Sequence, residues 1–156
     1  MAATGYGLID VMGSQGLVRV WGVIRTSPQL GLSERLAILF TELQAVVERE
    51  HPHEMAVEDG FFGKNPRTAL IIGQTRGIAL LVASLCELRV HLYSPAEVKL
   101  ALTGSGSASK DQVGFMVRRL LRLGDEKIPA DCTDALAVAM CRSQRMRFDE
   151  RIGKTR

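Results

Sequence analysis

The spacing of apolar positions divides the first third of the chain into two strands and a helix. Residues 5–11 and 16–26 are rich in apolar and β-branched side chains, and the intervening MGSQG supplies the glycines and the serine of a hairpin turn. From Ser33 to Glu50 the apolar residues recur at helical spacing, with Ser33 as a candidate N-cap. We therefore predict a strand hairpin followed by a helix.

The remaining two thirds alternate short strands with helices. The segment EMAVED predicts a strand, and a helix should follow from Asn65, a possible N-cap, with Pro66 in its first turn. This helix is apolar on most sides, so it is either central or packs against a partner. Further elements are expected in order, namely a strand over 89–94 and helices over 96–102, 109–123 and 129–144. This order predicts an α/β domain with a mixed sheet, antiparallel at its start and parallel afterwards.

The composition fits one soluble globular domain. The chain has 156 residues, 46% of them hydrophobic and 24% charged, which is enough apolar material for a single core. Its three cysteines form no CxxC pair and are interpreted as buried thiols in a reducing cytoplasm. Gln74 and Arg76 in the longest apolar run argue against a membrane span, and the N-terminus lacks the pattern of a signal peptide. We therefore expect a cytoplasmic protein.

The net charge of +3 is concentrated at the C-terminal end. After Met140 the chain carries six Lys and Arg residues against two acidic ones, so its basic character comes from this tail. A basic tail attracts nucleic acid, although a solvated chain end is the commoner explanation. Apolar content falls after Arg147, so we expect one domain over residues 1–147 and a basic, disordered tail over 148–156.

Three acidic residues are candidates for metal-dependent chemistry. Glu58 ends a short apolar strand, where α/β sheets place ligand sites, and Asp131 and Asp134 share one face at the start of a helix. Clustered carboxylates suit Mg²⁺ or Mn²⁺, and two such ions about 4 Å apart can clamp the attacking water and the leaving oxygen of a phosphodiester. The alternative is structural: Asp131 could cap its helix, Asp134 could favour the helix dipole, and Glu58 could be solvated. Asp59 lies on the opposite strand face and is expected to be solvated.

Two lysines and an aromatic pair could accompany these acids. Lys99 lies on a helix just after a strand, and Lys110 follows the flexible loop TGSGSAS. That loop is not a P-loop, because Ser109 stands where a P-loop has glycine before its lysine. Such lysines are usually solvated, but beside an acidic metal site a lysine can hold a phosphate as a point charge. Phe61 and Phe62, in the loop GFFGKN, either fold back onto the core or stack on an unpaired base.

Four stretches of the chain together resemble one nuclease family. They are TGYGLID, AVEDGFFGKNPRTALIIGQTRG, SPAEVKLALTGSGSASKDQV and PADCTDALAVAM, and they cover nearly the whole chain to about Arg145. Each alone is weak, but in this order they are similar to the RuvC family of Holliday-junction resolvases, endonucleases of RNase H-like fold. The resemblance implies an RNase H-like mixed sheet flanked by helices.

The resemblance also implies a function and its partners. It implies a homodimer that binds four-way DNA junctions and cuts two strands symmetrically in DNA recombination and repair. The implied cofactor is Mg²⁺, with Mn²⁺ expected to substitute, and a branch-migration motor is an implied partner. A two-fold dimer would set two active sites on a two-fold-symmetric junction, which would be recognised mainly through its phosphates and shape.

Carried over by position, the resemblance assigns roles to individual residues. The catalytic and metal-binding acids would be Glu58, Asp131 and Asp134. The DNA-contacting residues would be Phe61, Lys99 and Lys110. Asp131 stands at a position where the family also accepts His, and the helix from Asn65 resembles the family's dimer helix.

The N-terminus departs from the family pattern. The family begins with a strand ending in DPGxxxTGYG, whose Asp supplies the first catalytic carboxylate, and Thr4 matches the Thr of that pattern. Counting six residues back from Thr4 passes Met1, so the first strand and its Asp are expected to be missing and cleavage to be impaired. Asp10 is no replacement, since it follows the Thr instead of preceding it. Either the reading frame starts upstream, which we favour, or the gene is truncated.

Two other functions remain open on these residues. Loss of the first acid would also fit a non-catalytic junction-binding paralogue. An RNase H-like fold would also fit a nuclease that acts on RNA–DNA hybrids. Cleavage of four-way junctions with Mg²⁺ would exclude the first alternative, and preferential cutting of hybrid duplex would support the second.

Overall fold

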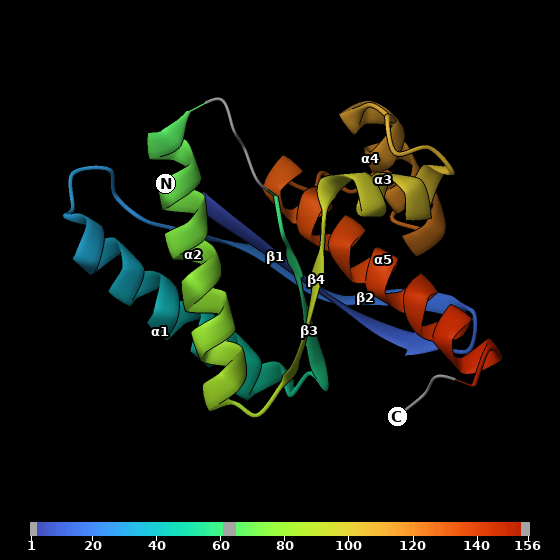
Figure 1. The fold of residues 1–156 in the computed structure, drawn as a ribbon, viewed down its shortest axis with the longest axis horizontal. Helices are drawn as coiled ribbons and strands as arrows, with labels where there is room; N and C mark the ends of the chain where they lie inside the picture. Colours follow the sequence, from blue (N-terminus) through green and yellow to red (C-terminus); the bar gives the residue numbers. More distant parts are fainter. Residues whose placement is uncertain (1–2, 61–64, 154–156) are drawn as a thin grey trace.

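The computed structural model describes residues 3–60 and 65–153, which form an α/β fold (Figure 1). Its elements follow in the order β1 (Ala3–Met12), β2 (Gln15–Arg25), α1 (Leu32–Glu50), β3 (Glu54–Glu58), α2 (Pro66–Leu85), β4 (Arg89–Tyr93), α3 (Pro95–Thr103), α4 (Lys110–Leu121) and α5 (Ala130–Arg151). Helices α1 and α2 lie on one side of the strands, and α5 with α3 and α4 lies on the other (Figure 1). The strands are therefore placed between two helical layers, as the predicted order of elements required.

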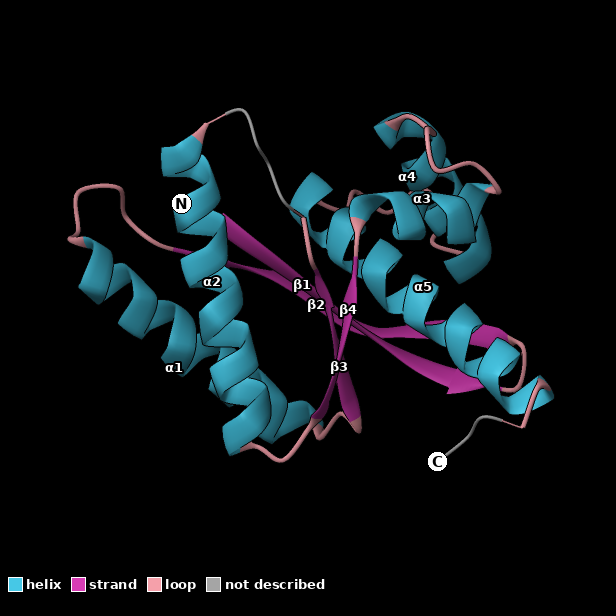
Figure 2. Ribbon diagram, in the orientation of Figure 1, coloured by secondary structure: helices cyan, strands magenta, loops and turns pink. Residues whose placement is uncertain are grey.

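The strands pair locally but not into one sheet. β1 and β2 are antiparallel, with Thr4 opposite Ile24, and β3 and β4 are parallel, with Glu58 opposite Tyr93. No backbone ladder joins β1 to β3 within the described residues, and Figure 2 shows the two strand pairs crossing at an angle. The predicted mixed sheet is therefore present as one antiparallel and one parallel pair, and the described residues do not join the pairs into one continuous sheet. Because β1 and β3 are not hydrogen-bonded to each other, each keeps an unpaired edge.

The best-buried side chains lie between α5 and its neighbours. Leu136, Val117 and Cys132 are almost completely inaccessible to solvent, and the main core cluster is built largely from α3, α4 and α5. By contrast, every residue of β1 and β3 keeps some contact with solvent, although helices lie on both sides of these strands. The middle of the fold is thus packed less completely than the layer around α5.

Local capping explains where the first two long helices begin. Asn65 caps α2 as predicted, since its Oδ1 accepts hydrogen bonds from two backbone N–H groups at 3.0 and 3.3 Å, and Pro66 is the first helical residue. Helix α1 begins earlier than predicted, because Gly31 is its N-cap and the Gly31 N–H donates to Glu34 Oε2 at 2.8 Å. The prediction that Ser33 is the N-cap is therefore wrong.

Helix α5 continues past the predicted domain boundary. It runs to Arg151, so the start of the segment predicted as a disordered tail, 148–156, is helical. The Arg145 guanidinium lies 5.7 Å from the centre of the Phe148 ring and 3.8 Å from Asp149, one turn further on. Contacts of this kind stabilise a helix end that has few apolar residues. The fall in apolar content after Arg147 therefore did not mark the end of the helix.

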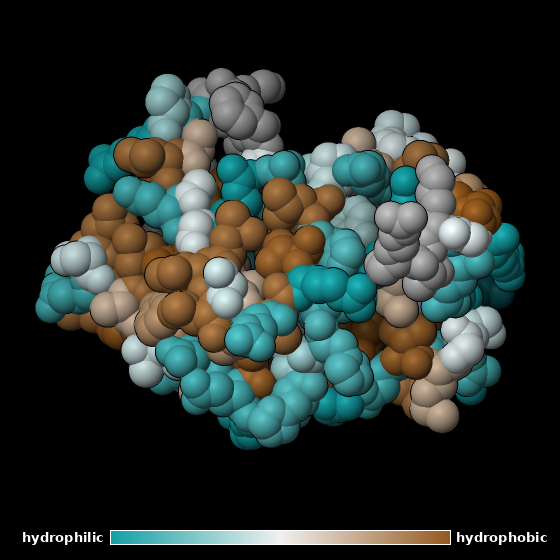
Figure 3. Space-filling view, turned by 60° about the horizontal axis from the view of Figure 1, so that its bottom comes forward, coloured by the Kyte–Doolittle hydropathy of each residue, from teal (hydrophilic) through white to brown (hydrophobic). Residues whose placement is uncertain are grey.

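Helix α2 is not a central helix. Its buried residues are Val82 and Ala83, whereas Leu70, Leu81 and Leu85 are 62%, 47% and 60% exposed. Figure 3 shows brown, apolar surface gathered over the side of the molecule formed by α1 and α2. By length and composition alone α2 could cross a membrane, a test that helices of soluble proteins also pass. Of the two predicted placements, the central one is wrong and packing against a partner remains.

Candidate active site

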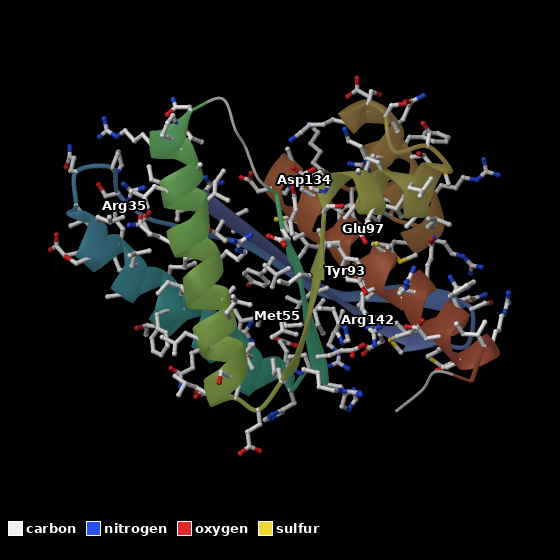
Figure 4. The ribbon with its side chains drawn as sticks, in the orientation of Figure 1. Arg35, Met55, Tyr93, Glu97, Asp134 and Arg142 are labelled. Atoms are coloured by element: carbon white, nitrogen blue, oxygen red, sulfur yellow. The ribbon has the colours of Figure 1, made fainter. Side chains whose placement is uncertain are left out.

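Four of the predicted site residues come from four different elements. Glu58 is the last residue of β3, Asp134 lies in the second turn of α5, Lys99 lies in α3, and Lys110 is the first residue of α4. Figure 4 shows Asp134 near the point where β4 leads into α3. This is the carboxyl end of the parallel pair β3–β4, where α/β folds place ligand sites.

The carboxyl group of Glu58 is influenced by the other three side chains. Its partial burial raises its pKa, and the negative charge of Asp134 raises it further. The positive charges of Lys110 and Lys99 act in the opposite direction. Asp134, Lys110 and Lys99 therefore all lie within electrostatic reach of Glu58.

Lys110 forms an ion pair with Asp134. Its Nζ donates a hydrogen bond to Asp134 Oδ2 at 3.1 Å, and this bond, together with the charge of Asp134, raises the pKa of Lys110. Ser109 caps α4 by accepting a hydrogen bond from the Gln112 N–H at 3.2 Å, which places Lys110 at the helix start. The Lys110 side chain is 84% exposed, so it is free to turn from Asp134 toward an incoming phosphate.

Asp131 lies in the first turn of α5 with an exposed side chain. It does not cap the helix, because Pro129 is the N-cap and makes no side-chain hydrogen bond, so the capping alternative is wrong. Its charge contributes to the raised pKa of Lys110. Across residues 3–60 and 65–153, however, no three His, Cys, Asp or Glu side chains are placed to hold one metal ion. The three predicted acids therefore do not form a ready three-ligand set.

The chemistry of the remaining pair fits a divalent cation that a phosphate helps to bind. Mg²⁺ is commonly held through one or two carboxylates together with waters and substrate phosphates. Glu58 and Asp134 supply two carboxylates, and a cation between them would relieve the repulsion that raises the pKa of Glu58. An all-oxygen donor set of this kind suits Mg²⁺ or Mn²⁺ better than softer metals.

Two other predictions near Glu58 have different outcomes. Phe61, with its neighbour Phe62, lies outside the described residues. Asp59 was expected to be solvated, and its side chain is 45% exposed, but its carboxylate is also ion-paired with Arg76 of α2. This pair ties the end of β3 to α2, directly beside the candidate site.

Sequence reasoning missed the residues that hold β3 against α5. Glu54 Oε1 and Oε2 accept hydrogen bonds from Arg142 at 2.9 and 3.0 Å, and His91 Nε2 lies 2.9 Å from Glu54 Oε2. Glu54 and Arg142 are 88 positions apart, so no local pattern connects them. The sequence offered one indication that Glu54 belongs with the site. Side chains alternate between the two faces of a strand, so Glu54 and Glu58 lie on the same face of β3.

Comparison with known proteins identifies the family. The family model described as crossover junction endodeoxyribonuclease RuvC matches residues 1–142. The chain belongs to the RuvC family. The RuvC of Pelotomaculum thermopropionicum is 41% identical over 151 residues, which cover 97% of this chain and 92% of the relative. The RuvC of Desulforamulus reducens is 46% identical over 143 residues, which cover 92% and 88%.

Solved RuvC structures share the fold. A structure of Thermus thermophilus RuvC superposes with a TM-score of 0.87 at 32% identity, covering 94% of this chain and 90% of the other. The structure of T. thermophilus RuvC in complex with a Holliday junction substrate superposes with a TM-score of 0.85 at 29% identity, covering 95% and 96%. The resemblance to RuvC and the RNase H-like α/β fold class are therefore confirmed.

Proposed function

We propose that this RuvC-family chain is a structure-specific endonuclease that resolves four-way DNA junctions by symmetric paired nicks, in DNA recombination and repair. The observation that carries the proposal is the convergence of Glu58 and Asp134, with Lys110 and Lys99 beside them, at the carboxyl end of β3. A related RuvC has been solved with a Holliday junction substrate, which supports the same substrate class for this chain.

We propose Mg²⁺ as the cofactor, with Mn²⁺ able to substitute. When bound, the cation would activate water and neutralise charge on the phosphate. Glu58 and Asp134 would hold it, and Lys110 would exchange its hydrogen bond to Asp134 for one to a phosphate oxygen. Lys99 would add a second positive charge at the same phosphate, and Asp131 would be an additional outer acid.

We further propose that a strand between β1 and β3 completes the site. In support, β1 and β3 are not paired with each other, and no residue of either is buried although helices lie on both sides. The family pattern expects an Asp at the end of such a strand, which would add a third carboxylate near Glu58. Without this ligand we expect weak metal binding and slow cleavage.

We propose a homodimer formed through α2. Leu70, Leu81 and Leu85 share one helix face, because positions eleven and fifteen residues apart are rotated by about 20° and 60°. All three are exposed, Figure 3 shows apolar surface gathered over α1 and α2, and an exposed apolar patch marks an interaction site. A two-fold dimer would match a two-fold-symmetric junction. The branch-migration motor partner and the cytoplasmic location belong to the same proposal and rest on the family resemblance.

The test is cleavage of a synthetic four-way junction with Mg²⁺. Glu58→Gln should abolish nicking but preserve junction binding, because it removes a metal ligand and leaves the basic side chains in place. Glu97→Gln is the matched control. Glu97 is an exposed acid of α3 that accepts a hydrogen bond from the Ser94 N–H at 2.8 Å, and Gln can keep this capping contact. Equal nicking by Glu58→Gln and the unmodified chain would exclude the acid assignment.

The same assay tests a second candidate, a non-catalytic junction-binding protein. This candidate is favoured by the lack of a three-acid metal group among the residues that the structure describes. The 156-residue chain would be compared with a chain extended at its N-terminus by a strand ending in Asp-Pro-Gly. Faster cleavage by the extended chain supports the resolvase, whereas binding without cleavage by both supports the junction-binding protein.

A further inference from the structure

Two glycines of β1 lie directly against α5. A Cβ atom at Gly7 would stand 2.6 and 2.7 Å from Cδ2 and Cγ of Leu136, which are side-chain atoms. A Cβ atom at Gly5 would instead overlap the backbone carbonyl carbon and oxygen of Asp131, and it would stand 2.8 Å from the Asp131 Cβ. At Gly5 the backbones of strand and helix are therefore in contact, and no side chain could rotate to make room.

This backbone contact lies at the end of α5 that carries the acids. Asp131 and Asp134 belong to the first two turns of α5, and the charge of Asp134 acts on Glu58 across the site. Farther along, the same helix is held to β3 by the two hydrogen bonds of Arg142. A side chain at Gly5 would therefore lift the acid-bearing end of α5 while its middle stays attached.

We propose that Gly5 is a positioning residue for the cleavage reaction. Its missing side chain lets the start of α5 lie on β1, and this contact sets the position of Asp134 relative to Glu58 on the neighbouring strand pair. The catalytic part of this inference rests on the proposed nuclease function, whereas the structural part does not. A displacement of about 1 Å in a reacting group can lower a rate roughly 10²-fold, so one added methyl group should be detectable.

The control for Gly5→Ala is Gly16→Ala. Gly16, in β2, also lies against α5, but at the middle of the helix, where a Cβ atom would meet Met140 Sδ at 2.9 Å and, on α4, Leu121 Cδ2 at 3.2 Å. The Met140 side chain is unbranched and has several rotatable bonds, so it can move aside without displacing the helix. The two substitutions thus add the same methyl group under the start and under the middle of one helix.

Five quantities would be measured for both variants and the unmodified chain. They are kcat and KM for junction cleavage with Mg²⁺, junction binding without metal, the backbone amide chemical shifts of the metal-free protein, and Tm. If the 156-residue chain turns over too slowly, the kinetics would use the N-terminally extended chain. Both variants should lose some Tm. Gly5→Ala alone should shift the amides of residues 131–134 and lower kcat roughly 10–10²-fold at unchanged KM and unchanged binding.

The possible results decide the structural and the catalytic parts separately. Unshifted amides over 131–134, or a normal kcat, in Gly5→Ala would overturn the positioning role. So would a Gly5→Ala chain that fails to fold where Gly16→Ala folds, because Gly5 would then serve the fold alone. If neither the 156-residue chain nor the extended chain cuts junctions, the nuclease function fails, and the amide shifts still decide whether Gly5 places the start of α5.

Discussion

Glu58 carries a charge that its surroundings do not fully balance in the metal-free protein. Burial and the charge of Asp134 raise its pKa, and the opposing effect of the two lysines is smaller. A carboxyl group whose pKa is raised on folding binds protons more tightly in the folded state than in the unfolded chain. The stability contribution of Glu58 therefore falls as the pH rises from its ordinary pKa of 4.5 through the folded pKa.

Replacing Glu58 by Gln should accordingly stabilise the metal-free protein at neutral pH. We expect a gain of a few degrees in Tm, since about 1 kcal/mol corresponds to roughly 2–4 °C in a domain of this size. The gain should disappear as the pH falls below the ordinary pKa of 4.5, where Glu58 is protonated in both states. Thermal unfolding between about pH 4 and 8 would measure it. Mg²⁺ should raise the Tm of the unmodified chain more than that of Glu58→Gln.

Glu97→Gln serves as the control for this experiment too. The backbone N–H and the hydroxyl of Ser94 lower the pKa of Glu97, so its contribution has the opposite pH dependence and is lost as the pH falls. Glu97→Gln should therefore gain nothing at neutral pH. A gain equal to that of Glu58→Gln would show that the effect does not arise from the surroundings of Glu58.

Strand β3 is fixed to α5 at the end opposite to Glu58. The Glu54 and Arg142 side chains are only 14% and 15% exposed, and their two parallel hydrogen bonds have the bidentate geometry of a strong ion pair. Burial alone would raise the pKa of Glu54, but Arg142, assisted by His91, outweighs it and lowers the pKa. Since Glu54 and Glu58 share a strand face, this pair also fixes how Glu58 is aligned with Asp134 along α5.

Removing Arg142 should therefore be costly. Arg142→Met leaves the Glu54 carboxylate largely buried and without its main partner, and we expect a loss of about 3–5 kcal/mol in the free energy of unfolding. Urea unfolding at neutral pH would measure it. Adding Glu54→Leu should restore much of the loss, because an apolar pair can replace a buried ion pair.

The matched control is Arg89→Met, which removes a weaker partner of the same carboxylate. Arg89 is 68% exposed and 3.9 Å from Glu54, so its loss should change the free energy of unfolding by about 0–1 kcal/mol. Equal losses in Arg142→Met and Arg89→Met would contradict the role of Arg142. The contribution of the Arg142 pair should itself fade as the pH falls through the lowered pKa of Glu54.

At the scale of the whole molecule, two surfaces lack a partner within the described chain. One is the apolar face of α2, and the other is formed by the unpaired edges of β1 and β3. The first can be covered by a second copy of the chain, and the second by an additional strand.

A charge on the α2 face should disrupt the proposed dimer. Leu81→Glu would place a carboxylate in an apolar interface, where it is strongly disfavoured without a partner, so the dimer should dissociate to monomers. Sedimentation or light scattering would measure the mass in solution, and the two nicks in one junction should lose their coordination. Leu17→Glu, on β2 and 43% exposed in the unmodified chain, should stay dimeric. A Leu81→Glu dimer, or an unmodified chain recovered with membranes, would contradict the α2 interface.

The sequence by itself determined the local elements and the family. The hairpin, the helix capped by Asn65, and the strand ending at Glu58 each follow from turn residues, caps and apolar period, which act over a few neighbouring positions. Four motif stretches in the right order were enough to predict the RuvC family and its fold class, and both are confirmed. Capping at Ser33 was wrong because Gly31, two residues earlier, offers its N–H to Glu34.

The tertiary structure alone decided which distant groups meet. The pairing of Lys110 with Asp134, the attachment of Glu54 to Arg142, and the split between the two strand pairs could not be predicted from local patterns. The exposure of α2 also could not be predicted from the sequence. An apolar helix has the same sequence pattern whether it lies in a core or at an interface. The physical reason is the distance along the sequence over which each interaction acts. Capping and periodicity act within a turn or two, whereas these contacts join distant segments that only the packing of α5 on the strands brings together.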